Sequence, residues 1–229
     1  MRRALCSENA PLGALEALGF DPILLPPHPS LPEPVASHAD MVCAVLDKTV
    51  FFDKIYIDTY PEIYRAVSGA GYRTECVPEP IGGEYPSDVL LNVLIGDGFA
   101  AGHISSSTTL RRRLEAAGKT FVPVKQGYAA CSCLSARDRL VTADAGIASA
   151  LSPFCKTLVV PSGGISLPPY GTGFIGGASG FDGERVYFVG DVHTHPAGKI
   201  VTEFLSDGGI CCVSLREGPL RDVGGIKFL

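Results

Sequence analysis

Hydrophobic and polar positions follow a pattern that occurs five times along the chain. Each copy is typical of a short amphipathic helix, usually followed by a glycine, then a short apolar strand and a loop. The five copies are APLGALEALGFDPILLPP (10–27), YPEIYRAVSGAGYRTECVP (60–78), STTLRRRLEAAGKTFVPV (107–124), DAGIASALSPFCKTLVVP (144–161) and PAGKIVTEFLSDGGICCVSL (196–215).

The third copy carries clear helix signals. Ser107 is a suitable residue to cap the helix start, because its hydroxyl can accept a hydrogen bond from a free backbone N–H of the first turn. Leu110 and Leu114 fall on one face of the helix. Gly118 suits the left-handed conformation that commonly ends a helix.

A second pattern lies between successive copies, namely two apolar runs around a polar turn. This pattern predicts β-hairpins at MVCAVLDKTVFF (41–52), DVLLNVLIGDGFAAGH (88–103), YAACSCLSARDRLVTAD (128–144) and GFIGGASGFDGERVYFVGD (173–191). The fifth hairpin lacks one arm, because only DVGGIKFL (222–229) follows the last copy. We expect RRALCS (2–7) to supply that arm by pairing with the C-terminal segment.

These units predict an α/β fold, a five-bladed α/β propeller of repeated hairpin-helix-strand units whose ring is closed by the N- and C-terminal strands. Residues 1–229 then form a single domain, since no linker divides them. A doubly wound α/β sheet is the alternative, but it explains the alternation without the hairpins. In a propeller, five loops converge on the central channel: SHADM (37–41), GGEYPSDVLLN (82–92), KQGYAACSC (125–133), PPYGTGFIGG (168–177) and GPLRDVGG (218–225).

Composition and charge narrow the class of partner. Hydrophobic residues make up 46% and charged residues 19%, which is typical of a compact protein. A net charge of -5 argues against nucleic acid as a partner, and the basic run at 111–113 reads as a solvated helix face. No segment approaches about 18 uninterrupted apolar residues, so the sequence predicts no membrane contact and a cytoplasmic location.

The sequence offers no signature of a metal site or a cofactor. The eight cysteines have no CxxC spacing and are expected to be mostly reduced. The stretch from His193 to His195 and its following proline resembles the HxHP segment of zinc-dependent JAMM peptidases, but Thr202 and Leu205 stand where that family has further ligands. The glycines of GTGFIGGASG (171–180) do not form GxGxxG, and close backbone approach explains them better than phosphate binding.

With the repeated unit in view, the chain resembles the guanidino-group modifying enzyme fold of arginine deiminases, dimethylarginine dimethylaminohydrolases and amidinotransferases, also called pentein-like. More narrowly, it resembles an uncharacterised family assigned to that fold, on the stretches YPSDVLLN (85–92), KQGYAACS (125–132) and GFIGG (173–177).

This resemblance implies one site residue and two departures. An acidic residue in a GGD-type segment binds the guanidinium in that fold, and GGEYPSD places Asp88 in this role despite an insertion after the glycines. The acid/base histidine would fall near Ala129, where the sequence has none. The nucleophilic cysteine would fall near Lys227 or Phe228, and that segment contains none.

The adjacent Cys211 and Cys212 do not replace the missing nucleophile. They lie in the strand that precedes the last hairpin, and the sequence shows no base or positive group beside them to lower a thiol pKa. We interpret them as packed structural cysteines.

Other polar residues open the predicted hairpins. His38 and Asp40 open the first at alternate positions, a pair that suits acid/base work, a polar ligand or simple loop capping. Cys131 and Cys133 open the third at alternate positions and hence on one face, which makes them better nucleophile candidates than Cys211 and Cys212.

The leading functional hypothesis is a central channel that binds a small polar or cationic nitrogenous ligand through Asp88, Asn92, Asp40 and His38. The protein would then be a pseudoenzyme of its fold, without the usual cysteine and histidine. One alternative is a hydrolase or transferase that acts on a C–N bond through a relocated Cys131 or Cys133. A second is a partner-binding scaffold with an inert channel. Oligomeric state is left open.

Overall fold

The computed structural model describes residues 2–229, which form a mixed α/β fold with five three-stranded sheets and one two-stranded sheet. The three-stranded sheets, in strand order, are β17 (Lys227–Phe228), β1 (Arg2–Cys6), β2 (Phe20–Leu24); β3 (Ala44–Leu46), β4 (Thr49–Asp53), β5 (Arg73–Val77); β6 (Leu94–Ile95), β7 (Phe99–Gly102), β8 (Thr120–Pro123); β9 (Cys133–Ala136), β10 (Arg139–Thr142), β11 (Lys156–Val159); and β13 (Ser179–Phe181), β14 (Arg185–Phe188), β15 (Cys211–Ser214). Strands β12 (Ile165–Ser166) and β16 (Leu220–Arg221) form the two-stranded sheet.

Every three-stranded sheet has the same topology. Its middle strand pairs antiparallel with one neighbour and parallel with the other. Two parallel strands must be joined by a crossover connection, and in each of these sheets that connection contains a helix. The predicted order of hairpin, helix and strand is therefore present in all five sheets.

The helices fall into two groups. The crossover helices are α1 (Leu12–Ala17), α3 (Lys54–Thr59), α4 (Pro61–Gly69), α5 (Thr108–Ala116), α7 (Ala145–Leu151) and α8 (Gly198–Ser206). Short helical turns lie in the connecting loops: η1 (Glu33–Val35), α2 (Ala39–Val42), η2 (Ser87–Val89), α6 (Ala129–Ser132) and η3 (Val192–Thr194). The turns α2 and α6 correct the expectation that the first and third hairpins begin directly at these residues.

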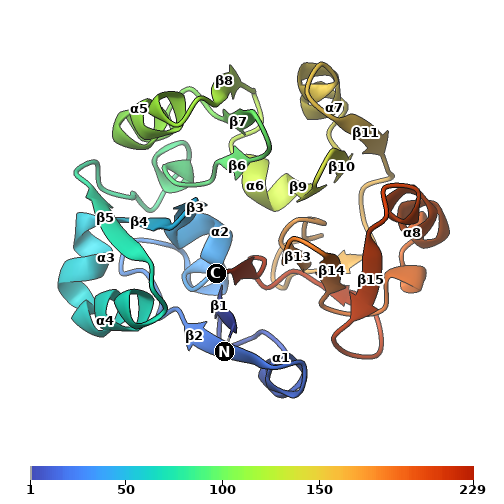
Figure 1. Ribbon diagram of the computed structural model, residues 1–229, viewed down its shortest axis with the longest axis horizontal. Helices are drawn as coiled ribbons and strands as arrows, with labels where there is room; N and C mark the ends of the chain where they lie inside the picture. The colour runs from blue at the N-terminus through green and yellow to red at the C-terminus, as the bar shows by residue number, and fades with distance from the viewer. Residues whose placement is uncertain (1) are drawn as a thin grey trace.

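The N- and C-terminal strands pair as predicted. Ala4 lies opposite Phe228 and Leu5 opposite Lys227 in the antiparallel ladder between β1 and β17. The five sheets lie around the middle of the molecule, with the crossover helices toward the outside (Figure 1). The first strand of each hairpin is therefore the one nearest the centre.

The helix signals in the third copy are confirmed in α5. The Ser107 hydroxyl accepts a hydrogen bond from the Leu110 backbone N–H at 3.1 Å. Leu110 and Leu114 are fully buried, and Gly118 follows the helix end with φ of 79°. Apolar burial of this kind, repeated between each sheet and its helix, contributes roughly 1.5–3 kcal/mol for each large aliphatic side chain.

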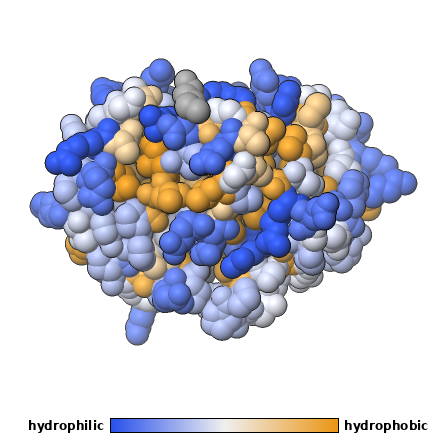
Figure 2. All heavy atoms as spheres, turned by 90° about the horizontal axis from the view of Figure 1, so that it is seen from below, coloured by the Kyte–Doolittle hydropathy of each residue, from blue (hydrophilic) through white to orange (hydrophobic). Residues whose placement is uncertain are grey.

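Part of the surface is apolar. Figure 2 views the molecule from below, the side that carries α1 and β2 in Figure 1, and shows a band of hydrophobic residues between hydrophilic ones. Leu24 of β2 and Tyr64 of α4 are among the exposed large apolar side chains. Within residues 2–229 no helix has both the length and the hydropathy of a membrane span.

A buried carboxylate anchors the second sheet to its helix. Asp53 ends β4, and its side chain accepts hydrogen bonds from the backbone N–H groups of Tyr56 at 2.9 Å and Ile81 at 3.0 Å. His28 Nε2 lies 3.1 Å from the same carboxylate, and both side chains are fully buried. Burial alone would raise the pKa of Asp53, but the hydrogen bonds from His28, Ile81 and Tyr56 together lower it. All of these contacts favour the ionised form.

We predict that Asp53→Asn destabilises the fold by about 2–4 kcal/mol, because the amide cannot accept all three hydrogen bonds in a buried site. The control is Asp58→Asn, which removes an exposed ion pair with Lys54 and should leave the free energy of unfolding nearly unchanged. Urea denaturation measures both. The stabilisation by Asp53 is present above about pH 4 and is lost as the pH falls through its lowered folded pKa. Equal effects of the two substitutions would contradict an anchoring role for Asp53.

Candidate functional site

A cavity of about 470 Å³ lies where the five predicted loops meet. All five loops contribute to its lining, which confirms that they converge. Their lining residues are His38 and Met41; Gly83, Glu84, Tyr85 and Asp88; Tyr128 and Cys131; Tyr170, Thr172 and Phe174; and Asp222. The lining therefore combines carboxylates with aromatic rings.

Asp88 lines this cavity and has one carboxylate oxygen without a hydrogen-bond partner within the described residues. The residue lies in η2 and is only 5% exposed. Its Oδ2 accepts a hydrogen bond from the Tyr128 hydroxyl at 2.7 Å, while Oδ1 has no hydrogen-bond partner among the described residues. Burial and the Asp88 carboxylate raise the pKa of Tyr128 far above its usual value, so this hydroxyl stays protonated and donates.

Asp222 provides a second buried carboxylate. Its Oδ2 accepts a hydrogen bond from the Phe174 backbone N–H at 2.8 Å, and its Oδ1 accepts one from the Gly224 N–H at 2.9 Å. Burial, followed by the nearby Asp40 carboxylate, raises the pKa of Asp222 to about 7. The site can therefore gain or lose a proton near neutral pH. The sequence predicted that Asp222 lies in one of the five converging loops, but no motif or spacing identified it as a site residue.

His38 and Asp40 lie close to Asp222. His38 Nδ1 is 3.8 Å from Asp222 Oδ1, beyond hydrogen-bond distance. Burial lowers the pKa of His38 and the Asp40 carboxylate only partly offsets this, so the imidazole is neutral at pH 7. Asp40 is 1% exposed, and neither of its carboxylate oxygens has a hydrogen-bond partner within the described chain. A buried carboxylate without donors is costly.

Asn92 positions the loop that carries Cys131. Its Oδ1 accepts hydrogen bonds from the backbone N–H groups of Ala130 at 2.8 Å and Cys131 at 3.4 Å, and its Nδ2 donates to Cys131 Sγ at 2.9 Å. Asn92 is fully buried and does not itself line the cavity. Its side chain therefore supports the turn α6, and its predicted contact with a ligand stays a prediction.

The Cys131 thiol lines the cavity but is not activated. Burial raises its pKa well above the usual value, and Asp40 and Asp222 raise it further, whereas the Asn92 amide acts in the opposite direction. A nucleophilic cysteine requires the opposite environment.

Cys131 and Cys133 do not share a face, so that expectation is wrong. Cys131 lies in the helical turn α6, whereas Cys133 begins β9, and the change of backbone conformation separates their side chains. Cys133 packs against Leu94 and Leu140 and does not line the acidic cavity. Burial raises its pKa to about 12.

The remaining candidate residues lie away from the cavity. Cys211 and Cys212 occupy β15, as the repeat predicted, but only Cys212 packs against the core, and Cys211 is exposed. His193 is exposed, and the buried His195 accepts a hydrogen bond at Nδ1 from the Ala197 N–H. Among residues 2–229 no group of three or more His, Cys, Asp or Glu side chains is arranged to hold a metal ion.

Glycines pack closely against several residues that line the cavity. A Cβ on Gly177 would overlap the Asp222 carboxylate, and one on Gly224 would overlap His38. A Cβ on Gly176 would overlap the carbonyl oxygens of Ala130, Cys131 and Cys133. Close approach of neighbouring segments therefore explains these glycines, as the sequence predicted for Gly176 and Gly177.

Comparisons with known proteins agree with this architecture. A family of unknown function, DUF6873, matches residues 7–227. No curated protein matches the sequence.

Several solved structures are similar to the chain. DDAH from Pseudomonas aeruginosa, as a mutant complexed with citrulline, has a TM-score of 0.57 at 11% identity and covers 93% of this chain and 92% of its own. SxtG, an amidinotransferase from Microseira wollei, has a TM-score of 0.53 at 14% identity, and the match covers 88% of this chain and 72% of SxtG. ArgZ, a cyanobacterial arginine dihydrolase, has a TM-score of 0.53 at 14% identity, and the match covers 96% of this chain and 37% of ArgZ. The chain therefore has the guanidino-group modifying enzyme fold.

The raised pKa of Asp222 predicts a specific pH dependence of stability. Its pKa rises from about 3.9 in the unfolded chain to about 7 in the fold. Its contribution is thus fully present below about pH 4 and is lost as the pH rises through 7. Asp222→Asn should remove this decline, which amounts to at most about 4 kcal/mol. Urea denaturation between about pH 4 and pH 8 measures the slope for wild type and variant.

The slope, rather than the absolute stability, is the informative quantity, because the amide of the Asp222→Asn variant cannot accept both backbone hydrogen bonds. Asp97→Asn, at an exposed carboxylate, should keep the wild-type slope. Identical slopes for wild type and Asp222→Asn would show that Asp222 has an ordinary pKa.

We also predict that iodoacetamide alkylates the exposed Cys76 and Cys211 first and Cys131 only slowly. The reason is that burial both shields the Cys131 thiol and raises its pKa. Peptide mass spectrometry over a time course measures the order, with guanidinium-unfolded protein as the control in which all cysteines react. Rapid native labelling of Cys131 would contradict this description of the thiol.

Proposed function

The chain belongs to DUF6873, a family of unknown function, and we propose that it binds a small cationic nitrogenous molecule in the acidic cavity. One observation carries this proposal. Asp88, Asp222 and Glu84 line the cavity and Asp40 lies behind it, whereas none of the described lining residues is Lys or Arg. The negative charge of the cavity therefore has no cationic side chain beside it.

Electrostatics favour a cation over a neutral ligand. Buried carboxylates are normally paired with a cation or fully hydrogen-bonded. Asp88 Oδ1 and both Asp40 oxygens have no such partner within residues 2–229. A ligand carrying several N–H donors would place positive charge beside these carboxylates and would hold Asp222 in its ionised form.

Aromatic rings add a second source of affinity. Tyr85, Tyr128, Tyr170 and Phe174 line the cavity, and the Tyr128 and Phe174 rings stack with centroids 6.3 Å apart. Aromatic faces attract cations by about 0.5–2 kcal/mol. The cavity volume of about 470 Å³ lies in the range of small-molecule sites.

We further propose that the five sheets act as the blades of a five-bladed propeller, with this cavity at one end of its channel. The shared topology of the sheets and the five converging loops support this arrangement. DDAH, which has the same fold, was solved with citrulline, a small nitrogenous molecule. That complex supports a ligand of comparable size here.

Turnover of a C–N bond through Cys131 is the second candidate, because its thiol lines the same cavity. The raised pKa of Cys131 and the neutral His38 argue against it. Cys133 is a weaker candidate still, since it lies outside the cavity. A partner-binding scaffold would use the apolar band of Figure 2 and leave the cavity unused.

We predict that a thermal-shift screen against guanidines, amidines, amino acids and polyamines yields a stabilising cation. At about 100 times its Kd such a ligand adds ~2.7 kcal/mol of stability, a shift of several degrees. Asp88→Asn should weaken binding about tenfold or more, because it removes a charge-assisted contact. The control Asp97→Asn changes an exposed carboxylate and should bind as wild type.

Two results would contradict the proposal. The first is the absence of any shift across the panel with Asp88→Asn as stable as wild type, which would favour the scaffold. The second is a ligand that is consumed during the assay, with loss of turnover on alkylation of Cys131, which would favour the enzyme.

A further inference from the structure

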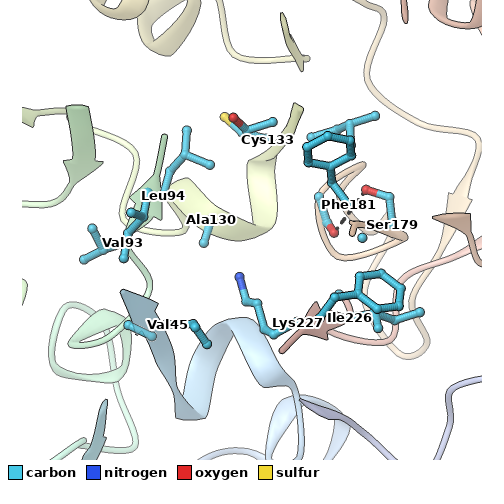
Figure 3. Close-up of a pocket in the computed structure, with 17 residues that line it drawn as sticks. Val45, Val93, Leu94, Ala130, Cys133, Ser179, Phe181, Ile226 and Lys227 are labelled. Atoms are coloured by element: carbon cyan, nitrogen blue, oxygen red, sulfur yellow. Dashed lines mark hydrogen bonds between the residues drawn. The ribbon is translucent and has the colours of Figure 1, made fainter. Parts of the chain in front are cut away.

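A second cavity, of about 260 Å³, lies among the strands nearest the centre of the molecule. The first strands of all five hairpins, β3, β6, β9, β13 and β17, contribute to its lining (Figure 3). Ala130 lines this cavity, whereas the next residue, Cys131, lines the acidic one. The turn α6 therefore lies between two separate cavities.

Lys227 is the charged residue of the second cavity. Figure 3 shows its side chain extending from β17 into the open space, on the side of Val45 and Ala130. The other described lining residues are uncharged, so no carboxylate there balances the ammonium. Lys227 Nζ also makes no ion pair or hydrogen bond within residues 2–229. The lining of this second cavity thus carries a positive charge, whereas the lining of the acidic cavity carries negative charges.

Hydrogen-bond donors accompany this charge. Each of the five lining strands lies at the edge of its sheet, and edge strands leave backbone N–H groups free on one side. Ser135 on β9 and Ser179 on β13 are also among the lining residues. An oxyanion accepts hydrogen bonds from such donors while a lysine supplies the point charge.

Apolar side chains also line part of the cavity. Val93 and Leu94 lie on one side of the cavity, and Phe181 and Ile226 lie on the other (Figure 3). These side chains suit the carbon atoms of an organic molecule rather than water alone. A bare inorganic ion would leave them without contacts.

We propose that this second cavity binds a small organic anion, with a carboxylate or phosphate group at Lys227 and a short apolar portion against the aliphatic and aromatic lining. The site is independent of the acidic cavity, because the two share no lining residue.

Isothermal titration at low salt with butyrate, butyl phosphate and butyramide tests the proposal. We expect at least one of the two anions to bind and the neutral butyramide, which has the same carbon chain, to bind at least about tenfold more weakly. The anion that binds more tightly identifies the preferred head group. Lys227→Met should weaken anion binding about tenfold or more, and Lys227→Arg should retain most of it. Lys199→Met, at a lysine that is 83% exposed on α8, should have no effect.

A second measurement uses only the wild-type protein and therefore does not depend on whether the variants fold. Acylation of Lys227 by an amine-reactive reagent, followed by peptide mass spectrometry, should slow in the presence of the bound anion, while acylation of Lys199 stays constant. The proposal is overturned if neither anion binds, if butyramide binds equally well, if Lys227→Met binds as wild type, or if Lys227 is not protected.

Discussion

Close approach of backbone segments at the centre of the molecule is the constraint on which both cavities depend. Side chains larger than hydrogen do not fit at Gly176, Gly177 or Gly224, because neighbouring carbonyls, Asp222 and His38 already occupy the space. This packing brings the segments that carry these residues close together. Carboxylates line one cavity and Lys227 lines the other.

Buried carboxylates in this protein fall into two groups, which differ in how fully their oxygens are hydrogen-bonded. Asp53 is satisfied by two backbone N–H groups and His28, which is typical of a residue that stabilises the fold. Asp88 has one oxygen without a partner and Asp40 has two, within the described chain. Polar groups left unsatisfied in a well-packed protein are costly, and this cost at Asp88 and Asp40 is the observation that the proposed cation binding would account for.

The sequence predicted the fold better than the site. Hairpin, helix and strand each have a local signal, so the five units and the pairing of β1 with β17 could be found from periodicity. Convergence of the loops followed from the same reasoning. The helical turn that separates Cys131 from Cys133 spans only four residues and has no strong signal. The importance of Asp222 depends on its distance from Asp40 and on its burial, which are properties of the folded chain.

The pairing of β1 with β17 has a consequence for the order in which the protein folds. Four of the five three-stranded sheets join segments that are near in sequence, whereas this one joins residues 4 and 228. Closing so long a loop carries the largest entropic cost, so this sheet is expected to form late. Asp222 and Lys227 lie on the segment that enters β17. Both cavities therefore gain their final wall in one step, and a partly folded chain would have neither cavity.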